Sequence, residues 1–162
     1  QLSIGDSLAV ATISKKNISK KDFKKFHPSG SLGAKLKTVE DLMLTKNKIP
    51  FINENSNMKE ALKVITQKKL GTLIVKNSKG NTTGIVTDGT IRRANEKNDN
   101  LQNLSVKKIM TKNPISVSKD MLAEKALSIM NQKKITSLCV DNYKNKTIGI
   151  LHIHNILDAK IQ

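Results

Sequence analysis

One stretch of this sequence occurs twice along the chain. Residues 84–93 begin with Gly-Ile-Val and residues 149–157 begin with Gly-Ile-Leu, and each stretch continues into polar residues. The two stretches start 65 residues apart, and the apolar residues 72–75 and 137–140 are separated by the same 65 residues. A repeated unit of this size cannot bury its apolar face alone, and stacked copies are needed for a continuous core. The sequence therefore predicts two similar halves that pack face to face.

Both copies show the same order of expected elements: strand, helix, strand, strand, helix. Apolar residues at helical spacing predict the first helix of each copy, around Ala61–Ile65 and Ala126–Met130. The second helix follows Asp88 in the first copy and occupies residues 153–160 in the second. The expected strands are residues 49–52, 72–75, 84–87, 114–117, 137–140 and 149–152. We therefore expect an α+β fold in which two repeats pair about a pseudo-two-fold axis.

The chain divides into four segments on this basis. Residues 38–96 form the first repeat, a polar linker occupies 97–105, and the second repeat occupies 106–160. Residues 1–36 lie outside the repeat and contain too few apolar residues to form a core alone. That first segment is expected to dock on further chain or on a partner.

The charge is strongly positive but is not focused on one segment. The formal net charge is +16, and every basic residue except Arg92 and Arg93 is a lysine. Aromatic residues, which stack on single-stranded bases, make up only 2%. A solvated lysine-rich surface is therefore favoured over a nucleic-acid site, although a polyanionic partner stays open.

The remaining composition argues against a membrane protein and against a disulfide framework. No run approaches the roughly 20 apolar residues of a transmembrane helix, and the first residues lack the pattern of a signal peptide. Cys139 is the only cysteine and lies within an apolar run, where it is expected to be a small buried side chain. A reducing, cytoplasmic setting is expected.

The two strand-to-helix junctions are the candidate ligand sites. In each copy an apolar strand ends in small polar residues where a helix begins. Free backbone N–H groups and hydroxyls at such a point suit a phosphate or a ribose. Helix capping by Thr87 or Asp88 is the alternative interpretation. The candidate ligand-binding residues are Gly71, Thr72, Thr87, Asp88, Thr90, Arg92, Arg93, Thr136, Ser137, His152, His154 and Asn155.

The basic residues of these junctions carry separate expectations. Arg92 and Arg93 are adjacent on one helix, and a guanidinium can bind phosphate through two N–H groups; a solvated helix face is the alternative. His152 and His154 alternate along a strand end and are expected to face opposite ways. One metal ion held by both is therefore not expected, and neither is a cofactor.

Taken together, these residues resemble a tandem pair of cystathionine-β-synthase-type (CBS) repeats, also called a Bateman module. The resemblance covers about residues 38–160 and rests on Leu42-Met43, on Ile109-Met110-Thr111 and on both Gly-led junctions. It implies a module that binds adenosine or other nucleotides in clefts between the repeats and signals to an attached protein. It also implies dimerisation as a flat disc.

The resemblance gives the junction residues specific roles. CBS repeats place a Ser or Thr hydroxyl against phosphate or ribose, which corresponds to Thr87. An Asp three residues later usually binds the ribose hydroxyls, but here that residue is Thr90, which lacks two charged acceptor oxygens. In the second copy the two positions are His152 and Asn155, and Asn155 can still accept one hydrogen bond.

The first segment resembles the end of the sugar isomerase (SIS) domain of arabinose-5-phosphate isomerases. The matching residues are 5–11, Asp22-Phe23 and His27-Pro28-Ser29-Gly30-Ser31-Leu32-Gly33, where Ser29 replaces the usual Gly. That family joins a SIS domain to a CBS pair and interconverts ribulose 5-phosphate and arabinose 5-phosphate, a precursor of the sugar acid Kdo. His27 would then be catalytic in the complete enzyme, since an imidazole suits proton transfer near neutral pH.

The expected function is therefore that of a regulatory CBS pair, without catalysis of its own, in such an isomerase. The expected ligand is a nucleotide or nucleotide sugar, and the activated end product CMP-Kdo is the specific hypothesis. Two alternatives stay open. In one, the pair is degenerate and serves only to hold an oligomer together; in the other, the lysine-rich surface binds nucleic acid.

Overall fold

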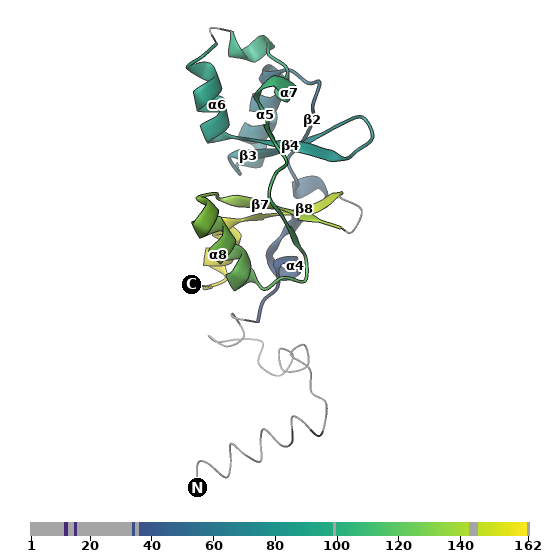
Figure 1. Ribbon diagram of the computed structural model, residues 1–162, viewed down its shortest axis with the longest axis vertical. Helices are drawn as coiled ribbons and strands as arrows, with labels where there is room; N and C mark the ends of the chain where they lie inside the picture. The colour runs from purple at the N-terminus through teal and green to yellow at the C-terminus, as the bar shows by residue number, and fades with distance from the viewer. Residues whose placement is uncertain are drawn as a thin grey trace.

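The computed structural model describes residues 12, 15, 34, 36–98, 100–142 and 146–161. His27 and nearly all of the SIS-like segment lie outside the described residues. The described chain forms two halves that are stacked on each other, and each half is a four-stranded sheet with helices packed on it (Figure 1). Among the described residues, no helix is both long and apolar enough to cross a bilayer.

The first half contains the sheet β2-β3-β4-β5. β2 and β3 are parallel neighbours, and the crossover helix α5 connects them. β3 with β4, and β4 with β5, form antiparallel pairs. The elements are β2 (Phe51–Asn53), α5 (Met58–Lys68), β3 (Thr72–Lys76), β4 (Thr82–Thr87), α6 (Asp88–Asn95), η2 (Leu101–Asn103), α7 (Val106–Ile109) and β5 (Thr111–Lys112). The predicted order of strand, helix, strand, strand and helix is confirmed.

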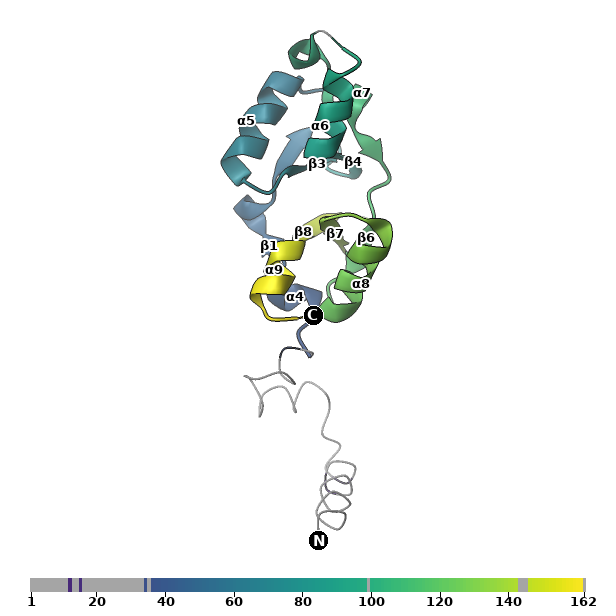
Figure 2. The same ribbon diagram turned by 90° about the vertical axis from the view of Figure 1, so that its left-hand side faces the viewer.

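The second half repeats this plan in the sheet β1-β8-β7-β6. Its elements are α4 (Val39–Leu42), β1 (Leu44–Thr45), β6 (Ser116–Ser118), α8 (Ala123–Lys133), β7 (Ser137–Asp141), β8 (Thr147–His152) and α9 (Ile153–Asp158). A 3-10 turn, η1 (Lys46–Lys48), follows β1. The two sheets face each other, and the helices of each half lie on the outer side of its own sheet (Figure 2). α6 and α9 both begin at the side of their half that faces the other half.

The start of each sequence repeat belongs to the opposite half of the fold. β1 opens the first repeat but pairs with β8 of the second, where Leu44 faces Ile150. β5 opens the second repeat but pairs with β4 of the first. The preceding helices cross over as well, since Val39 is buried in the second core and Val106 in the first. The sequence pattern alone does not indicate this exchange.

The exchange explains why a glycine leads both copies of the repeated stretch. The side chain of Met110 lies over Gly84, and a Cβ there would be 2.6 Å from the Met110 Sδ atom. Met43 covers Gly149 in the same way, at 2.5 Å. The incoming chain can therefore approach the sheet only because these positions lack a side chain.

Equivalent residues of the two repeats meet at the pseudo-two-fold axis. The hydroxyls of Thr72 and Ser137, which are 65 residues apart, are 3.2 Å from each other. Thr82 and Thr147 have the same separation and are hydrogen-bonded at 2.7 Å. An apolar cluster that includes Ile74 and Cys139 fills the space between the two sheets.

Cys139 is fully buried in that central cluster, as the sequence predicts. Burial, with the nearby Asp141 carboxylate as a smaller cause, raises the pKa of its thiol to about 12. The thiol is therefore protonated at neutral pH and serves as packing between the sheets.

We predict that Gly84→Ala lowers the free energy of unfolding by about 1–3 kcal/mol, because the new methyl group collides with Met110 and with the carbonyl oxygen of Thr111. Urea unfolding of both proteins measures the difference. Gly80→Asn is the matched control, because a Cβ at Gly80 would meet no atom within 4 Å and Asn tolerates its φ of +79°. An equal loss in both variants would contradict the packing explanation.

Candidate functional site

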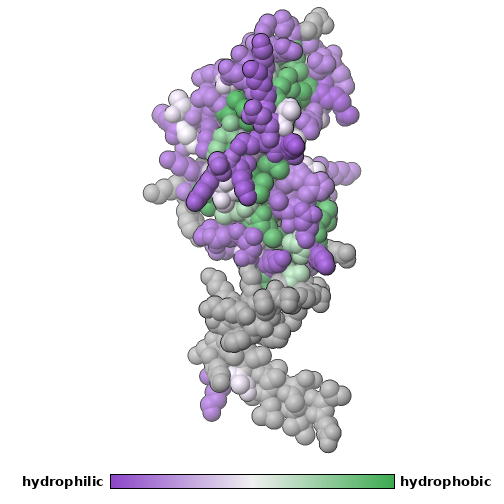
Figure 3. All heavy atoms as spheres, turned by 180° about the vertical axis from the view of Figure 1, so that it is seen from behind, coloured by the Kyte–Doolittle hydropathy of each residue, from purple (hydrophilic) through white to green (hydrophobic). Residues whose placement is uncertain are grey.

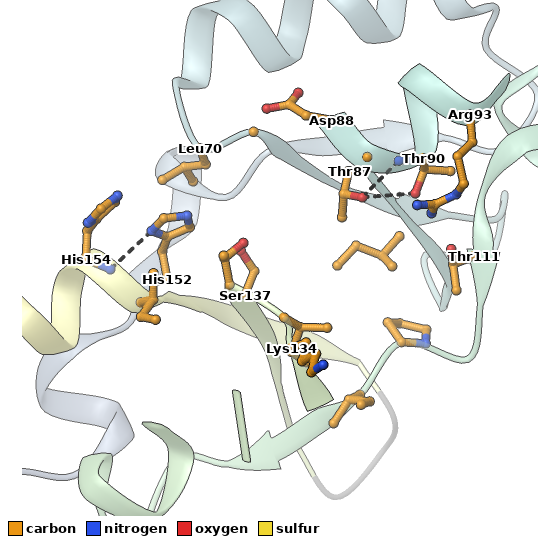
Figure 4. Close-up of a pocket in the computed structure, with 18 of the residues that line it drawn as sticks. Leu70, Thr87, Asp88, Thr90, Arg93, Thr111, Lys134, Ser137, His152 and His154 are labelled. Atoms are coloured by element: carbon orange, nitrogen blue, oxygen red, sulfur yellow. Dashed lines mark hydrogen bonds between the residues drawn. The ribbon is translucent and has the colours of Figure 1, made fainter. Parts of the chain in front are cut away.

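A cavity of about 760 Å³ opens where the two halves meet. It is lined by residues of both repeats, many of them equivalent to each other: Lys69 and Lys134, Gly71 and Thr136, Thr87 and His152. Figure 4 shows Thr87, Thr90, Arg93 and Thr111 at one end of the cavity and His152 and His154 at the other. Both strand-to-helix junctions therefore contribute to one site.

Most of the candidate residues from the sequence line this cavity. They are Gly71, Thr87, Asp88, Thr90, Arg93, Thr136, Ser137, His152 and His154. Three others do not. Thr72 is buried, with its hydroxyl directed to Ser137; Arg92 is exposed on α6 beside Arg93; and Asn155 is occupied in a helix cap.

At the first junction one hydroxyl group both caps a helix and faces the cavity. Thr87 is the N-cap of α6, and its Oγ1 atom accepts a hydrogen bond from the Thr90 N–H at 3.2 Å. The two threonine hydroxyls are 2.9 Å apart. Because one donates to the other, a single hydroxyl proton of the pair remains to be donated to a ligand. The capping interpretation of Thr87 is confirmed and does not exclude ligand contact.

Asp88 is the first residue of α6, and its backbone N–H donates to the carbonyl oxygen of Gly71 at 3.0 Å. Its carboxylate lies against Gly71, where a Cβ would be only 2.6 Å from Oδ2. Gly71 has a φ of +60°, a conformation that favours glycine. The glycine therefore leaves the space that this carboxylate occupies at the cavity edge.

At the second junction, the prediction that His152 and His154 face opposite ways is wrong. Their ring centroids are 5.0 Å apart, and both rings lie at the same end of the cavity (Figure 4). Side chains two positions apart on a strand lie on the same face, so alternation along the strand does not separate these two rings. The strand ends at His152, which is the N-cap of α9. The His152 Nδ1 atom accepts the His154 N–H at 3.3 Å, and the Asn155 Oδ1 atom accepts the His152 N–H at 3.1 Å.

The environment keeps His152 neutral. Burial lowers the pKa of His152 below its ordinary value, and the neighbouring His154 lowers it further. A neutral imidazole is also what the cap requires, because a protonated Nδ1 cannot accept a hydrogen bond.

The fixed charges of the cavity are mostly positive. Lys69, Lys134 and Arg93 line it together with the carboxylate of Asp88. This arrangement favours an anionic ligand, and the hydroxyls and backbone groups can add directional contacts. Within the described ranges, no three His, Cys, Asp or Glu side chains are grouped so that they could hold a metal ion.

One wall of the cavity is formed by residues that the sequence pattern does not mark as site residues. Thr111, Asn113, Pro114 and Ile115 line it, whereas the apolar pattern predicts Pro114 and Ile115 in a strand that in fact begins at Ser116. Ile115 is 39% exposed, which is unusual for a large apolar side chain in the described part of the chain. Pro114 is the residue that could have indicated this, because a proline has no N–H to donate to a neighbouring strand. Its presence argues against a regular strand at Pro114 and Ile115.

The comparison with protein families identifies the fold. The CBS domain family matches residues 39–97 and 106–161. The chain belongs to the CBS domain family. Its two matched segments form a CBS pair, and the cavity lies between them.

Curated relatives extend the similarity over almost the whole chain. The CBS pair with its first segment is 37% identical to the arabinose 5-phosphate isomerase KdsD of Francisella tularensis. It is 35% identical to the protein of the same name from Escherichia coli. In both cases 99% of this chain is covered but only 49% of the relative. The chain therefore spans about half the length of these relatives.

Solved structures agree with the fold of the CBS pair. The plant protein CBSX2 from Arabidopsis thaliana, in complex with AMP, has a TM-score of 0.68 and 25% identity. The match covers 77% of this chain and 96% of that one. An uncharacterized protein from Pyrococcus horikoshii also has a TM-score of 0.68, at 23% identity, covering 77% and 92% of the two chains.

We predict that lowering the pH below about 6.5 destabilises the CBS pair through His152. The unfolded chain binds a proton at the ordinary pKa, whereas the folded state resists protonation. Stability is therefore lost progressively as the pH falls from the ordinary pKa towards the lower folded pKa. Above the ordinary value both states are neutral and His152 contributes no pH dependence.

Urea unfolding of the wild type and of His152→Asn, from pH 7 to about pH 5, measures this effect. Asn keeps a cap acceptor and does not titrate, so the difference in stability between the two proteins should change with pH in favour of the variant. A difference that stays constant over this range would rule out the proposed role of His152.

Proposed function

We propose that this CBS pair binds an anionic nucleotide-type ligand in the cavity between its repeats and passes the bound state to an attached sugar-phosphate isomerase. The carrying observation is that a hydroxyl pair, Thr87 and Thr90, and three cationic side chains line one cavity at the joint of the two halves. Its volume of about 760 Å³ is in the range of small-molecule sites.

The two comparisons support this proposal from different sides. CBSX2, with the same fold, is a protein solved in complex with AMP. The relatives that resemble the whole chain are named arabinose 5-phosphate isomerases. The parent protein is then an enzyme that interconverts ribulose 5-phosphate and arabinose 5-phosphate. In that protein residues 1–36 end the SIS domain, His27 serves its active site, 38–96 and 106–160 are the repeats, and 97–105 links them.

The specific ligand that we propose is a nucleotide sugar of the CMP-Kdo type. Such a ligand carries a phosphate and a sugar carboxylate, and Arg93, Lys69 and Lys134 supply cations for both. CBS repeats usually have an aspartate at the position of Thr90, and a carboxylate there would repel the second negative charge of such a ligand. The neutral hydroxyl of Thr90 therefore favours a doubly anionic ligand over an uncharged nucleoside. Binding of a pathway end product would make the module a feedback sensor in the cytoplasm.

A second candidate is a scaffold that only holds copies of the isomerase together. The observation in its favour is that Thr87, His152 and Asn155 all make helix caps, which use part of their hydrogen-bonding capacity. Self-association without nucleotide affinity would support it. The surface gives less support to nucleic acid as a partner, because the lysines are spread along the chain and are not gathered in one segment. Hydrophilic residues cover most of the face in Figure 3, around a broken apolar band.

Titration calorimetry with AMP, ATP, CMP and CMP-Kdo tests the proposal, and Arg93→Ala is the informative variant. Loss of a guanidinium contact to the ligand should weaken binding about tenfold. Arg92→Ala is the matched control, because Arg92 is the neighbouring arginine on α6 and does not line the cavity. No heat with any of the four ligands would favour the scaffold.

A further inference from the structure

The cavity is lopsided, although the fold that contains it is pseudo-symmetric. Near the axis both members of equivalent pairs line it, such as Lys69 with Lys134. On the side of β5 it continues along Thr90, Arg93 and Thr111. We call these three residues and their neighbours 113–115 the β5 side. None of the equivalent residues on the side of β1 lines the cavity.

The chemistry of the two sides also differs. The repeat offset relates Thr90 to Asn155 and Arg93 to Asp158, and the exchanged strands relate Thr111 to Leu44. An arginine is thus replaced by a carboxylate, and a hydroxyl by an apolar side chain. The side-chain carbonyl oxygen of Asn155 accepts the His152 N–H. At these positions the β1 side therefore has no arginine and no hydroxyl and carries a carboxylate instead, and its cations are Lys48 and Lys68 beside η1.

A short insertion fills the space on the β1 side. Lys46 and Asn113 occupy equivalent positions and both have a φ of +54°. After Asn113 the chain runs through Pro114 directly to β6, whereas after Lys46 it makes the 3-10 turn η1 before β2. The Lys68 Nζ atom donates to the carbonyl oxygen of Asn47 and ties this turn to the end of α5. The first repeat thus closes the cleft that the second repeat leaves open.

What remains beside η1 is a separate, shallower hollow of about 380 Å³. It is lined by Leu44, Asn47, Lys48, Gln67, Lys68 and Leu70, and by neither His152 nor Asn155. It does not reach the second strand-to-helix junction, so that a ligand there could not use the junction's backbone N–H groups.

We propose that this chain holds one anionic ligand, on the β5 side, and that the pseudo-symmetric cleft is permanently closed. The identity of the ligand rests on the proposed function. The number of ligands per chain and the cleft that holds the ligand are separate claims. The occupied half is the one built from Thr87, Arg93 and Thr111, and binding is therefore transmitted through β4, β5 and α6. The second junction contributes His152, Ile153 and His154 to the wall of this same cavity, while the hydrogen bonds between His152 and Asn155 cap α9.

Titration calorimetry of the chain with two probes, AMP and inorganic pyrophosphate, tests the number of sites. The expected stoichiometry is one ligand per chain. Charge reversal at equivalent positions tests the place: Arg93→Asp should weaken binding about tenfold or more, whereas Asp158→Arg should leave both affinity and stoichiometry unchanged within about twofold. Both residues lie at exposed positions on helices, and thermal unfolding of each variant checks that the fold is kept.

Amide chemical shifts give an independent readout of the same claim. Addition of either probe should shift the amides of Thr90 and Thr111 and leave those of Leu44 and Asp158 in place. Two ligands per chain, or equal effects of the two charge reversals, would overturn the single-site inference while leaving the proposed function intact. Pyrophosphate binding at one site without AMP binding would support the single site and refute the nucleotide function. Binding of neither probe would overturn both.

Discussion

The fold depends on the exchange of edge strands between its two sequence repeats. β1 completes the sheet of the second half and β5 that of the first. Ion pairs hold the crossing segments, Glu40 with Lys119 and Lys107 with Glu54. Ion pairs at the protein surface contribute less than about 1 kcal/mol each. Their effect is to determine which half each crossing segment packs on, because equivalent positions of the two repeats carry opposite charges. A segment docked on its own half would place like charges together, Glu40 with Glu54 or Lys107 with Lys119.

The candidate site uses groups that the fold already requires. Thr87 must cap α6 because a helix beginning at a sheet edge leaves backbone N–H groups without partners. The same position turns its hydroxyl toward the cavity. At the other junction, His152 and Asn155 satisfy the cap between themselves, which leaves less capacity for a ligand. A difference in capping chemistry thus separates two junctions that share the same repeated pattern.

The sequence predicts the fold because a fixed offset constrains every element in both copies. It predicts most of the site for the same reason, since Thr87 and His152 are both located by the repeat. It does not reveal that Val39 packs in the second core, because the local pattern of a short helix is the same whichever half receives it. His152 and His154 lie on the same side, which is what the two-residue period of a strand indicates, so the expected opposite orientation did not follow from the pattern. The pattern places Ile115 in a strand because apolar character alone does not separate a buried residue from a cavity wall.

The exchange of strands also orders the assembly of the module in time. The first half, from β2 to β5, is a continuous segment of the chain. The second half is discontinuous, since β1 precedes that segment and β6 to β8 follow it. One half is therefore inserted in the other. On a ribosome, the inserted half has all of its strands as soon as Lys112 has emerged, while Leu44 must wait for Ile150. The order in which the two sheets can form during synthesis is therefore set by the chain connectivity, although the two halves have the same architecture.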